Sequence, residues 1–307
     1  MSLDRILVIG AKGQLGSALL RQDWPVGAFV LPATRDQLDI TDPAAVWSYL
    51  LRWRPRVVVN AAAWTDVDRA EREPEAAMAV NGRAVTSIVQ GVEAIGARLI
   101  HLSTDYVFDG ATEGWYREGD QVNPLNAYGR SKRAGELAAL ELDDSLVIRT
   151  SGLYSSTGEN FVSTIRTLAR SRERLEVVDD QRCCPTSADD LAGAIVAAVQ
   201  AGLDHAGLFH VAAPDDATWW EVADEILRLD GVREKVELVR RRSEPGRRHD
   251  DPEGTGVALR PRDSRLSSDA FAAAYDLVLP PWRASVAEVC DQLRRQDREP
   301  ANELTAR

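Results

Sequence analysis

The sequence predicts an α/β protein with a doubly wound parallel sheet and a smaller α/β lobe after it. Three observations lead to this prediction. Short apolar, β-branched runs alternate with longer amphipathic stretches over residues 1–150, a glycine-rich turn follows the first run, and the alternation loosens after Ser151. Continuous apolar strands between helices indicate a parallel sheet covered on both faces. We therefore expect a sheet domain at 1–150, a substrate lobe at 151–295 and a tail at 296–307, and leave an exchange of strands between the first two open.

Each predicted element of the sheet domain is a stretch in which the spacing of apolar residues is typical of either a strand or a helix. The predicted strands are Arg5–Ile9, Ala28–Leu31, Val57–Asn60, Leu99–Ser103 and Leu146–Arg149. The helices between them are Gly13–Gln22, Pro43–Arg54, Glu73–Ile95 and Asn126–Glu141. In the lobe we expect helices Asn160–Ser171, Ser187–Gln200, Trp219–Leu229 and Ala284–Arg295, and strands Glu176–Val178 and Leu208–Val211. The stretch Ser243–Arg265 is rich in Pro, Gly and charge and is predicted to be a long loop.

Composition excludes several classes of protein. A formal net charge of −11 argues against nucleic acid as the main partner, since phosphate binding needs a concentrated basic surface. Three cysteines without metal-ligand spacing indicate neither a disulfide framework nor a zinc site. The first apolar run is too short for a signal peptide or a membrane span, so we expect a cytoplasmic protein. One group of basic residues is either a solvated loop or a phosphate-facing patch: Arg240, Arg241, Arg242, Arg247 and Arg248.

The first strand is followed by a GxxGxxG turn that opens a helix. Glycines at these positions permit a tight turn and a close approach of the backbone to a pyrophosphate, which then rests on the helix N-terminus. At the first strand–helix turn of an α/β domain, this pattern predicts a Rossmann dinucleotide site. The residues that we expect to bind the cofactor here are Gly10, Lys12, Gly13, Gln14, Leu15 and Gly16.

The ends of the next two strands carry further candidate cofactor residues. Arg35 stands where a site for NAD often has an acidic residue, and an arginine there can hold the 2′-phosphate of NADP. The sequence therefore favours NADPH and leaves NADH open. Asp39 and Ile40 suit an adenine edge and face, although the neighbouring Thr41 and Asp42 also cap the helix that follows. After the third strand, Ala61, Ala62 and Ala63 would form a floor for the cofactor, with Thr65 beyond them.

A tyrosine and a lysine four residues apart form the candidate catalytic pair. Tyr128 and Lys132 lie on a predicted helix, where residues i and i+4 share a face. The positive charge of the lysine favours the tyrosinate, so we expect the phenol to exchange a proton near neutral pH. Thr104, at the end of the fourth strand, can bond the same carbonyl oxygen and orient it. Together with the glycine turn, these residues predict a nicotinamide-dependent oxidoreductase.

Eight segments give the chain a resemblance to a known family. They are GAKGQLG at Gly10, LDITDP at Leu38, NAAAWTDVDRAE at Asn60, AVN ending at Asn81, STDYVFDG at Ser103, YGRSK at Tyr128, GENF at Gly158 and VVDDQ…PT from Val177 to Thr186. In order and spacing they resemble the extended short-chain dehydrogenase/reductases, and within them the dTDP-4-dehydrorhamnose reductase branch, over roughly residues 1–295. The STDYVFDG and DDQxxPT segments are specific to this branch.

The resemblance implies reduction of the C4 keto group of dTDP-6-deoxy-L-lyxo-4-hexulose to give dTDP-L-rhamnose. It assigns proton donation to Tyr128, binding of the nicotinamide ribose to Lys132, and orientation of the carbonyl to Thr104. Asn81 would support the active-site strand, and a homodimer is compatible with the sequence. The substrate residues that we expect are Thr65, Val67, Thr104, Asp105, Tyr106, Gly152 and Asn160, the last near the diphosphate.

Three positions depart from the family pattern. Gly152 replaces the aromatic residue of an RTSW segment, and Cys183 and Cys184 replace small residues in DDQxxPT. These positions lie near the expected substrate pocket and bear on which sugar binds. Leu15 stands where some members carry a glutamate linked to a metal at a dimer interface, so we expect no metal.

Other functions on this fold remain as alternatives. A 4,6-dehydratase needs an acid beside its Thr-Asp pair, and Tyr106 stands there instead. An epimerase, which would retain its cofactor through the catalytic cycle, is excluded by the sequence less firmly than a dehydratase. The main alternative is a 4-ketoreductase for a different dTDP-deoxysugar in natural-product biosynthesis, and a more remote one is a non-catalytic regulatory or binding subunit.

Overall fold

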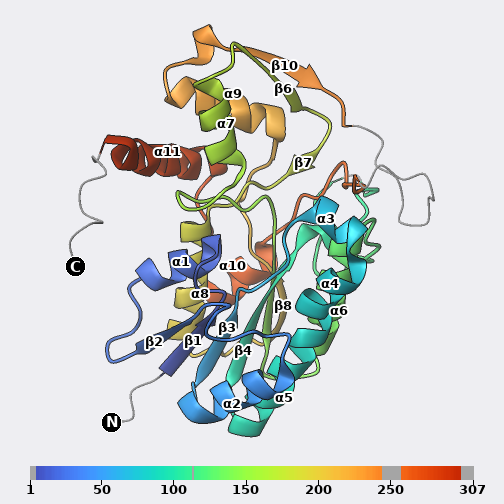
Figure 1. The fold of residues 1–307 in the computed structure, drawn as a ribbon, viewed down its shortest axis with the longest axis vertical. Helices are drawn as coiled ribbons and strands as arrows, with labels where there is room; N and C mark the ends of the chain where they lie inside the picture. Colours follow the sequence, from blue (N-terminus) through green and yellow to red (C-terminus); the bar gives the residue numbers. More distant parts are fainter. Residues whose placement is uncertain (1–4, 113, 244–256, 299–307) are drawn as a thin grey trace.

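A six-stranded parallel sheet forms the centre of the computed structural model, which describes residues 5–112, 114–243 and 257–298 (Figure 1). The strand order is β2-β1-β3-β4-β5-β8. The strands are β1 (Arg5–Ile9), β2 (Phe29–Ala33), β3 (Val57–Asn60), β4 (Arg98–Thr104), β5 (Leu146–Thr150) and β8 (Gly207–His210). The chain reverses direction across the sheet between β1 and β3, and such a switch point opens a crevice at the carboxyl ends of the strands.

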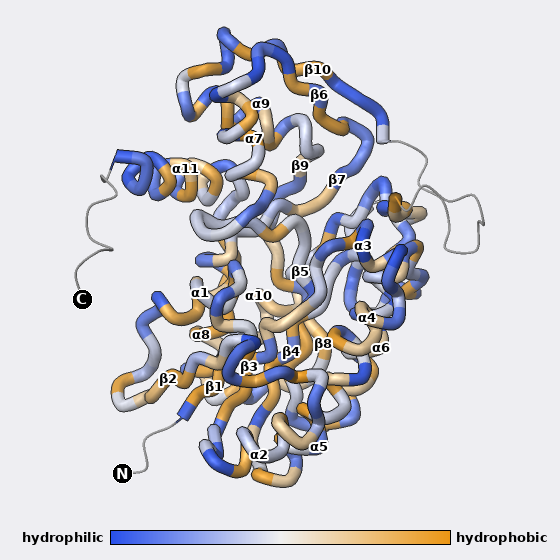
Figure 2. The backbone as a smooth tube through the Cα atoms, viewed as in Figure 1, coloured by the Kyte–Doolittle hydropathy of each residue, from blue (hydrophilic) through white to orange (hydrophobic). Residues whose placement is uncertain are grey.

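Helices cover both faces of this sheet, as the sequence predicted. One face packs against α2 (Pro43–Trp53), α5 (Ala84–Ile95) and α6 (Ala127–Ala139), and the other against α1 (Gln14–Arg21), α8 (Ala188–Gln200) and α10 (Asp269–Tyr275). Side chains of a strand alternate between faces, so in β1 Ile6 and Val8 join one apolar cluster and Leu7 and Ile9 the other. The hydrophobic colouring of the strands in Figure 2 follows from this double burial.

The small lobe lies beyond the carboxyl ends of the strands, at the top of Figure 1. Its parallel pair is β6 (Arg174–Val178) with β10 (Glu237–Arg241), and its antiparallel pair is β7 (Arg182–Cys183) with β9 (Ala217–Thr218). Its helices are α7 (Phe161–Ala169), α9 (Trp219–Leu229) and α11 (Trp282–Arg298), with a short turn η3 (Arg233–Lys235). An apolar cluster that includes the fully buried Trp282 joins the three helices.

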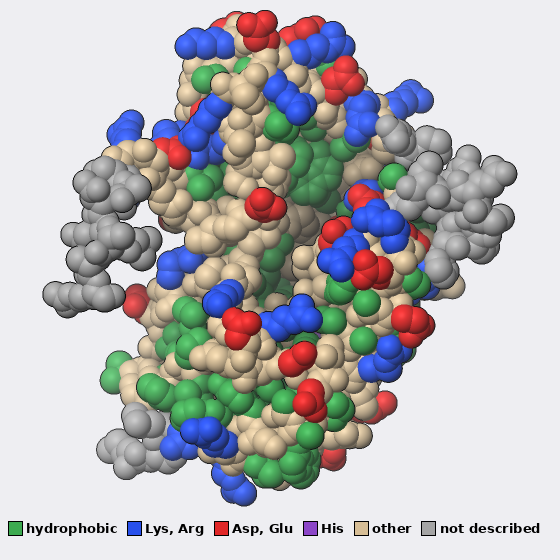
Figure 3. Space-filling view, in the orientation of Figure 1, with side chains coloured by type: hydrophobic (Ala, Val, Ile, Leu, Met, Phe, Trp, Pro, Cys, Tyr) green, Lys and Arg blue, Asp and Glu red, His purple; other side chains and the backbone are tan. Residues whose placement is uncertain are grey.

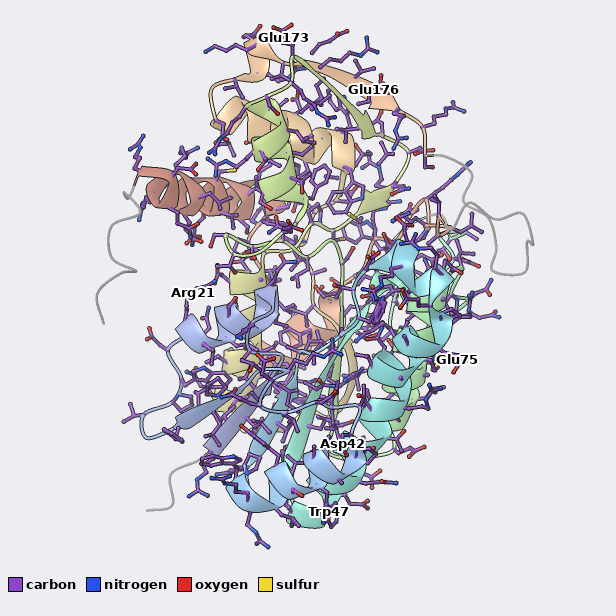
Figure 4. All side chains as sticks on the ribbon, viewed as in Figure 1. Arg21, Asp42, Trp47, Glu75, Glu173 and Glu176 are labelled. Atoms are coloured by element: carbon purple, nitrogen blue, oxygen red, sulfur yellow. The ribbon has the colours of Figure 1, made fainter. Side chains whose placement is uncertain are left out.

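The sheet layers draw on sequence well beyond residue 150. The predicted strand Leu208–Val211, expected in the lobe, is β8 and pairs with β5. Helix α8 packs on α1, where Arg21 (Figure 4) donates to Asp189 at 2.7 Å. A strand far along the chain can join the sheet because β5 would otherwise present an unpaired edge.

Several local predictions were wrong in detail. The single helix expected at Glu73–Ile95 is α4 (Pro74–Met78), a π-helical turn η1 (Ala79–Arg83) and α5, and α3 (Val67–Arg72) was not anticipated. Arg240 and Arg241 belong to strand β10, while Arg247, Arg248 and residues 244–256 of the expected loop lie outside the described residues. Helix α11 runs to Arg298, past the predicted start of the tail, and the rest of that tail is not described. Among the described helices, none has the length and apolar character needed to cross a membrane.

A buried ion pair fastens α6 to the sheet. Glu136 accepts from Arg149 of β5 at 2.7 and 2.9 Å, from Ser103 of β4 at 2.6 Å and from Arg133 at 2.7 Å. Glu136 and Arg149 are at most 1% exposed. Burial alone would raise the pKa of Glu136, but the bonds from Arg149 and Ser103 hold that pKa below its usual value. The carboxylate is therefore charged and fully paired.

Removal of one partner should destabilise the protein strongly. We expect Arg149→Met to lower the free energy of unfolding by about 3–5 kcal/mol, because Glu136 then stays buried without its main counter-charge. Urea denaturation followed by circular dichroism measures this loss. Arg69→Met, which breaks an exposed pair with Glu73, is the matched control and should leave the midpoint nearly unchanged. Equal effects of both substitutions would contradict the prediction.

Candidate active site

A cavity of about 840 Å³ lies between the carboxyl ends of the strands and the small lobe. Figure 3 shows hydrophobic side chains exposed in the hollow between these two parts of the molecule. Apart from Gly16, every residue predicted from the sequence to bind cofactor or substrate or to act in catalysis lines this cavity. Residues more than 150 positions apart in the chain therefore meet at one site.

The glycine turn forms the cavity wall between β1 and α1. Gly10 has a φ of +81°, which favours glycine, and Gly13 starts α1 without a side-chain cap. The first amides of α1 are therefore free to bind an anion. Gly16 is not in the cavity lining and allows close packing of the turn, since a Cβ there would lie 2.1 Å from the carbonyl oxygen of Gly10.

The next part of the cavity suits the adenosine end of a dinucleotide. The exposed Lys12 pairs with Asp36 at 3.2 Å, and the exposed Arg35 lines the same region. Asp39 accepts from the Thr41 hydroxyl at 2.7 Å and from its amide at 2.9 Å, and these bonds lower the pKa of Asp39. Ile40 offers an apolar surface beside these charges. Open helix amides, two cations and an apolar surface together fit a dinucleotide with an additional phosphate.

The candidate catalytic pair, Tyr128 and Lys132, lies on the first two turns of α6. Asn126 caps this helix by accepting from the Gly129 amide at 2.8 Å, which fixes where Tyr128 begins to project into the cavity. Lys132 follows one turn later and donates to the carbonyl oxygen of Leu102 in β4. Thr104, at the end of β4, lines the same cavity as Tyr128 and Lys132. The structure thus brings together the three residues predicted for catalysis.

Burial controls the ionisation of the pair. It lowers the pKa of Lys132 to about 8 and raises the pKa of Tyr128 to about 12. The sequence predicted that the lysine charge would favour the tyrosinate, but the loss of water around the phenol raises the pKa of Tyr128, and the negative charge of Asp105 acts in the same direction. Tyr128 is therefore protonated at neutral pH and can act as a proton donor.

The carboxylate of Asp105 is hydrogen-bonded mainly to other side chains of the protein, although Asp105 also lines the cavity. It is 3% exposed, and its carboxylate accepts from Thr104 at 3.0 Å, Ser151 at 2.8 Å and Ser264 at 2.6 Å. The neighbouring Tyr106 places its ring edge-on to Tyr128, with centroids 5.8 Å apart. Asp105 was predicted to contact the sugar, yet both of its carboxylate oxygens already accept hydrogen bonds from the chain.

Two asparagines also hold backbone in place. Asn160 was predicted near the diphosphate; it lines the cavity and caps α7, accepting from the Val162 amide at 3.0 Å and donating to the Ser155 carbonyl at 2.8 Å. Asn81 was expected to support the active-site strand. It bonds the backbone of Trp64 instead, at 2.8 and 3.0 Å, and so fixes the loop after β3, where Thr65 and Val67 line the cavity. The π-helical turn that carries Asn81 is a geometry often found at functional sites.

The two departures from the family pattern near the sugar pocket lie side by side. Gly152 has a φ of +54°, and a Cβ on it would lie 3.1 Å from Cα of Pro185 and 3.2 Å from Sγ of Cys183. An aromatic side chain at 152 would strain the backbone here. Burial raises the pKa of Cys183, so its thiol is neutral. Gly152 and Cys183 thus form one small-residue wall of the cavity.

Sequence reasoning missed several residues of the site. Phe161 and Trp219 line the lobe side with ring centroids 4.6 Å apart, and Arg182 lies near them. Pro261 and Ser264 come from the segment predicted to be a loop. The aromatic residues each follow a helix cap, which could have signalled a fixed position, but nothing in the sequence around Ser264 indicates its place beside Asp105.

Comparison with known proteins gives a consistent family. The profile described as RmlD substrate binding domain matches residues 4–295. A dTDP-4-dehydrorhamnose reductase of Streptomyces griseus is 42% identical over 92% of each chain. A dTDP-4-keto-6-deoxy-D-glucose reductase of Streptomyces niveus is 39% identical, over 93% of this chain and 96% of the relative.

Solved structures agree with the sequence comparison. A dTDP-4-dehydrorhamnose reductase of Bacillus anthracis, crystallised in complex with NADP, superposes with a TM-score of 0.85 at 31% identity, covering 93% of this chain and 98% of that one. The match extends over the sheet domain and the small lobe together. The chain therefore belongs to the dTDP-4-dehydrorhamnose reductase family of the short-chain dehydrogenase/reductases.

Proposed function

We propose that this protein reduces the C4 keto group of dTDP-4-dehydro-6-deoxy-L-mannose (dTDP-4-dehydrorhamnose) to give dTDP-L-rhamnose, with NADPH as the hydride donor. The observation that carries the proposal is the meeting of Thr104, Tyr128 and Lys132 in the cavity that the glycine turn also lines. The names of the relatives support the sugar, and the NADP complex of the Bacillus anthracis protein supports the cofactor.

Different residues of the cavity bind the cofactor and transfer the proton. A bound nicotinamide supplies the hydride for C4. The amides at the start of α1 hold the pyrophosphate, and Arg35 holds the 2′-phosphate. Tyr128 donates its proton to the carbonyl oxygen, and the Lys132 charge stabilises the phenolate that remains. Elimination is disfavoured because Tyr106 occupies the position that an additional acid would need.

A second candidate function is reduction of a different dTDP-4-keto-6-deoxysugar. Two observations favour it: the wall formed by Gly152 and Cys183, and the relative named as a dTDP-4-keto-6-deoxy-D-glucose reductase at 39% identity. A panel of dTDP- and UDP-4-keto sugars, with the stereochemistry of each product determined, separates the two. Turnover of non-rhamnose precursors alone would reject the rhamnose assignment and keep the reductase class.

Removal of the phenol hydroxyl tests the catalytic assignment. We expect Tyr128→Phe to lower kcat for the 4-keto sugar by about 10²–10⁴-fold, since general-acid catalysis contributes this much. The decrease in NADPH absorbance measures the rate. Tyr49→Phe, on α2 and outside the cavity, is the control and should keep the parental rate. Unchanged reduction by Tyr128→Phe would overturn the assignment of Tyr128 as the proton donor. No reduction of any 4-keto sugar by the parent protein would overturn the enzyme function and favour a binding subunit.

The ionisation of Lys132 should appear in the pH profile. Burial lowers the pKa of Lys132 to about 8, so its ammonium is charged below this pH and loses the charge above it. We expect kcat to fall as the pH rises through about 8, because the phenolate formed on Tyr128 then lacks its stabilising charge. Lys132→Arg keeps a charge throughout, so whatever activity it retains should show no such fall. The same alkaline limb in both proteins would assign it to another group.

Arg35 should decide the choice between the two nicotinamide cofactors. We expect Arg35→Asp to raise the KM for NADPH at least about tenfold, because a carboxylate repels the 2′-phosphate, and to leave the KM for NADH within about threefold. Steady-state kinetics with each cofactor measure both constants. Arg172→Asp makes the same charge change at an exposed position outside the cavity and should alter neither KM. Equal effects on NADPH and NADH would show that Arg35 does not read the phosphate.

A further inference from the structure

Residues 258–264, here called the crossing segment, belong to a stretch that was predicted to be a loop, and the proposed reaction gives them no role. We propose that Asp68 and Arg260 are positioning residues whose ion pair holds the crossing segment against α3 and so sets the width of the cavity around the sugar. The pair thereby determines how tightly the sugar is bound. The identity of the ligand as a nucleotide-linked sugar rests on the proposed function.

The ion pair joins the immediate neighbours of two residues that line the cavity. On α3, Asp68 directly follows Val67. In the crossing segment, Arg260 directly precedes Pro261, and both Val67 and Pro261 line the cavity. Asp68 Oδ2 accepts from Arg260 at 3.0 Å, and Asp68 Oδ1 accepts from the Ala258 amide at 2.9 Å. The pair therefore fixes the spacing between two cavity walls that come from distant parts of the chain.

Other hydrogen bonds hold the two ends of the crossing segment. At its start, Asn126, the cap of α6, donates to the Leu259 carbonyl at 2.7 Å. At its end, the Ser264 amide donates to the carbonyl of Arg182 in β7 at 2.9 Å, and the Ser264 hydroxyl donates to Asp105 at 2.6 Å. The crossing segment thus runs from the cap of the catalytic helix to the small lobe.

A glycine lets the middle of the crossing segment approach the sheet domain closely. Gly110, in the loop after β4, has a φ of +75°. A Cβ on it would lie 2.7 Å from the amide nitrogen of Arg262 and 2.9 Å from Cβ of Pro261. The position of Pro261 is therefore set both by this close packing and by the ion pair of its neighbour Arg260.

Both partners of the pair are charged and only partly buried. Burial alone would raise the pKa of Asp68, but the bonds from Arg260 and from the Ala258 amide hold that pKa below its usual value. The side chain of Asp68 is 38% exposed and that of Arg260 is 27% exposed. Water screens a pair with this exposure, so its loss should change the local spacing without unfolding the protein.

Binding of an unreactive nucleotide sugar tests the pair without turnover. Asp68→Asn keeps an oxygen for the Ala258 amide and removes the charge opposite Arg260, and Arg260→Gln removes the other charge. In each variant we expect the Kd for dTDP-glucose to rise about three- to fivefold, because a pair as exposed as this one contributes no more than about that factor to an equilibrium. The Kd for dTDP, which lacks the sugar, should stay within about 1.5-fold of the parent value.

Isothermal titration calorimetry with NADPH present measures both constants, since NADPH cannot reduce a sugar that has no keto group. A general loss of stability would weaken the binding of both ligands, so the difference between them reports the wall beside the sugar. Asp224→Asn is the matched control: it breaks a pair of similar exposure with Arg233, outside the cavity, and should change neither Kd.

Two further variants show whether Asp68 and Arg260 act as one pair. If they do, the double variant Asp68→Asn with Arg260→Gln binds dTDP-glucose as tightly as either single variant, since the second substitution finds the pair already broken. Arg260→Lys keeps the positive charge and should restore most of the parental affinity.

Three results would overturn the proposal. Unchanged affinities in both single variants would show that the pair does not set the cavity wall. Equal rises in both Kd values in Arg260→Gln, with Asp68→Asn unchanged, would make Arg260 a direct contact of the diphosphate. A parent protein that binds dTDP no more weakly than dTDP-glucose would show that this wall contacts no sugar. A parent protein that binds dTDP-glucose but reduces no 4-keto sugar would reject the proposed function, while the Kd comparison would still decide the role of the pair.

Discussion

The buried ion pair between Glu136 and Arg149 is the interaction on which the catalytic centre depends. It fastens α6 to β5 and, through Ser103, to β4. Tyr128 and Lys132 stand on that helix, and Thr104 ends β4, so their mutual geometry follows from this one junction. Two charges removed from water stabilise a protein only when their hydrogen bonds are complete. Here four bonds to the carboxylate meet that condition.

The same loss of water determines the chemistry of the site. Tyr128 and Lys132 are buried at the site. Burial raises the pKa of Tyr128 and lowers the pKa of Lys132, so it favours the neutral form of each. A protonated phenol and a lysine titrating near neutral pH suit delivery of a proton to a carbonyl oxygen. Reduction is thus favoured by burial as much as by the identity of the residues.

The side of the cavity proposed for the sugar differs from the side proposed for the cofactor in how it is built. The proposed cofactor side consists of residues at the turn after β1 and the ends of β2 and β3. The proposed sugar side combines the loop after β3, the wall of Gly152 and Cys183, and the segment with Ser264. Changes in the second set can alter the sugar while the hydride chemistry stays the same, which agrees with relatives of similar identity being named for different sugars.

Local patterns in the sequence were enough to predict the layered fold and the glycine turn, and to select Thr104, Tyr128 and Lys132, which the structure brings to one cavity. Each of these depends on spacing within one element or on the end of a strand, and the carboxyl ends of parallel strands necessarily meet at one edge. Only the tertiary structure added β8 to the sheet, showed the close packing at Gly16, and placed Ser264 against Asp105. It also reversed the expected shift of Tyr128, because burial and contacts between distant segments leave no periodic signal in the sequence.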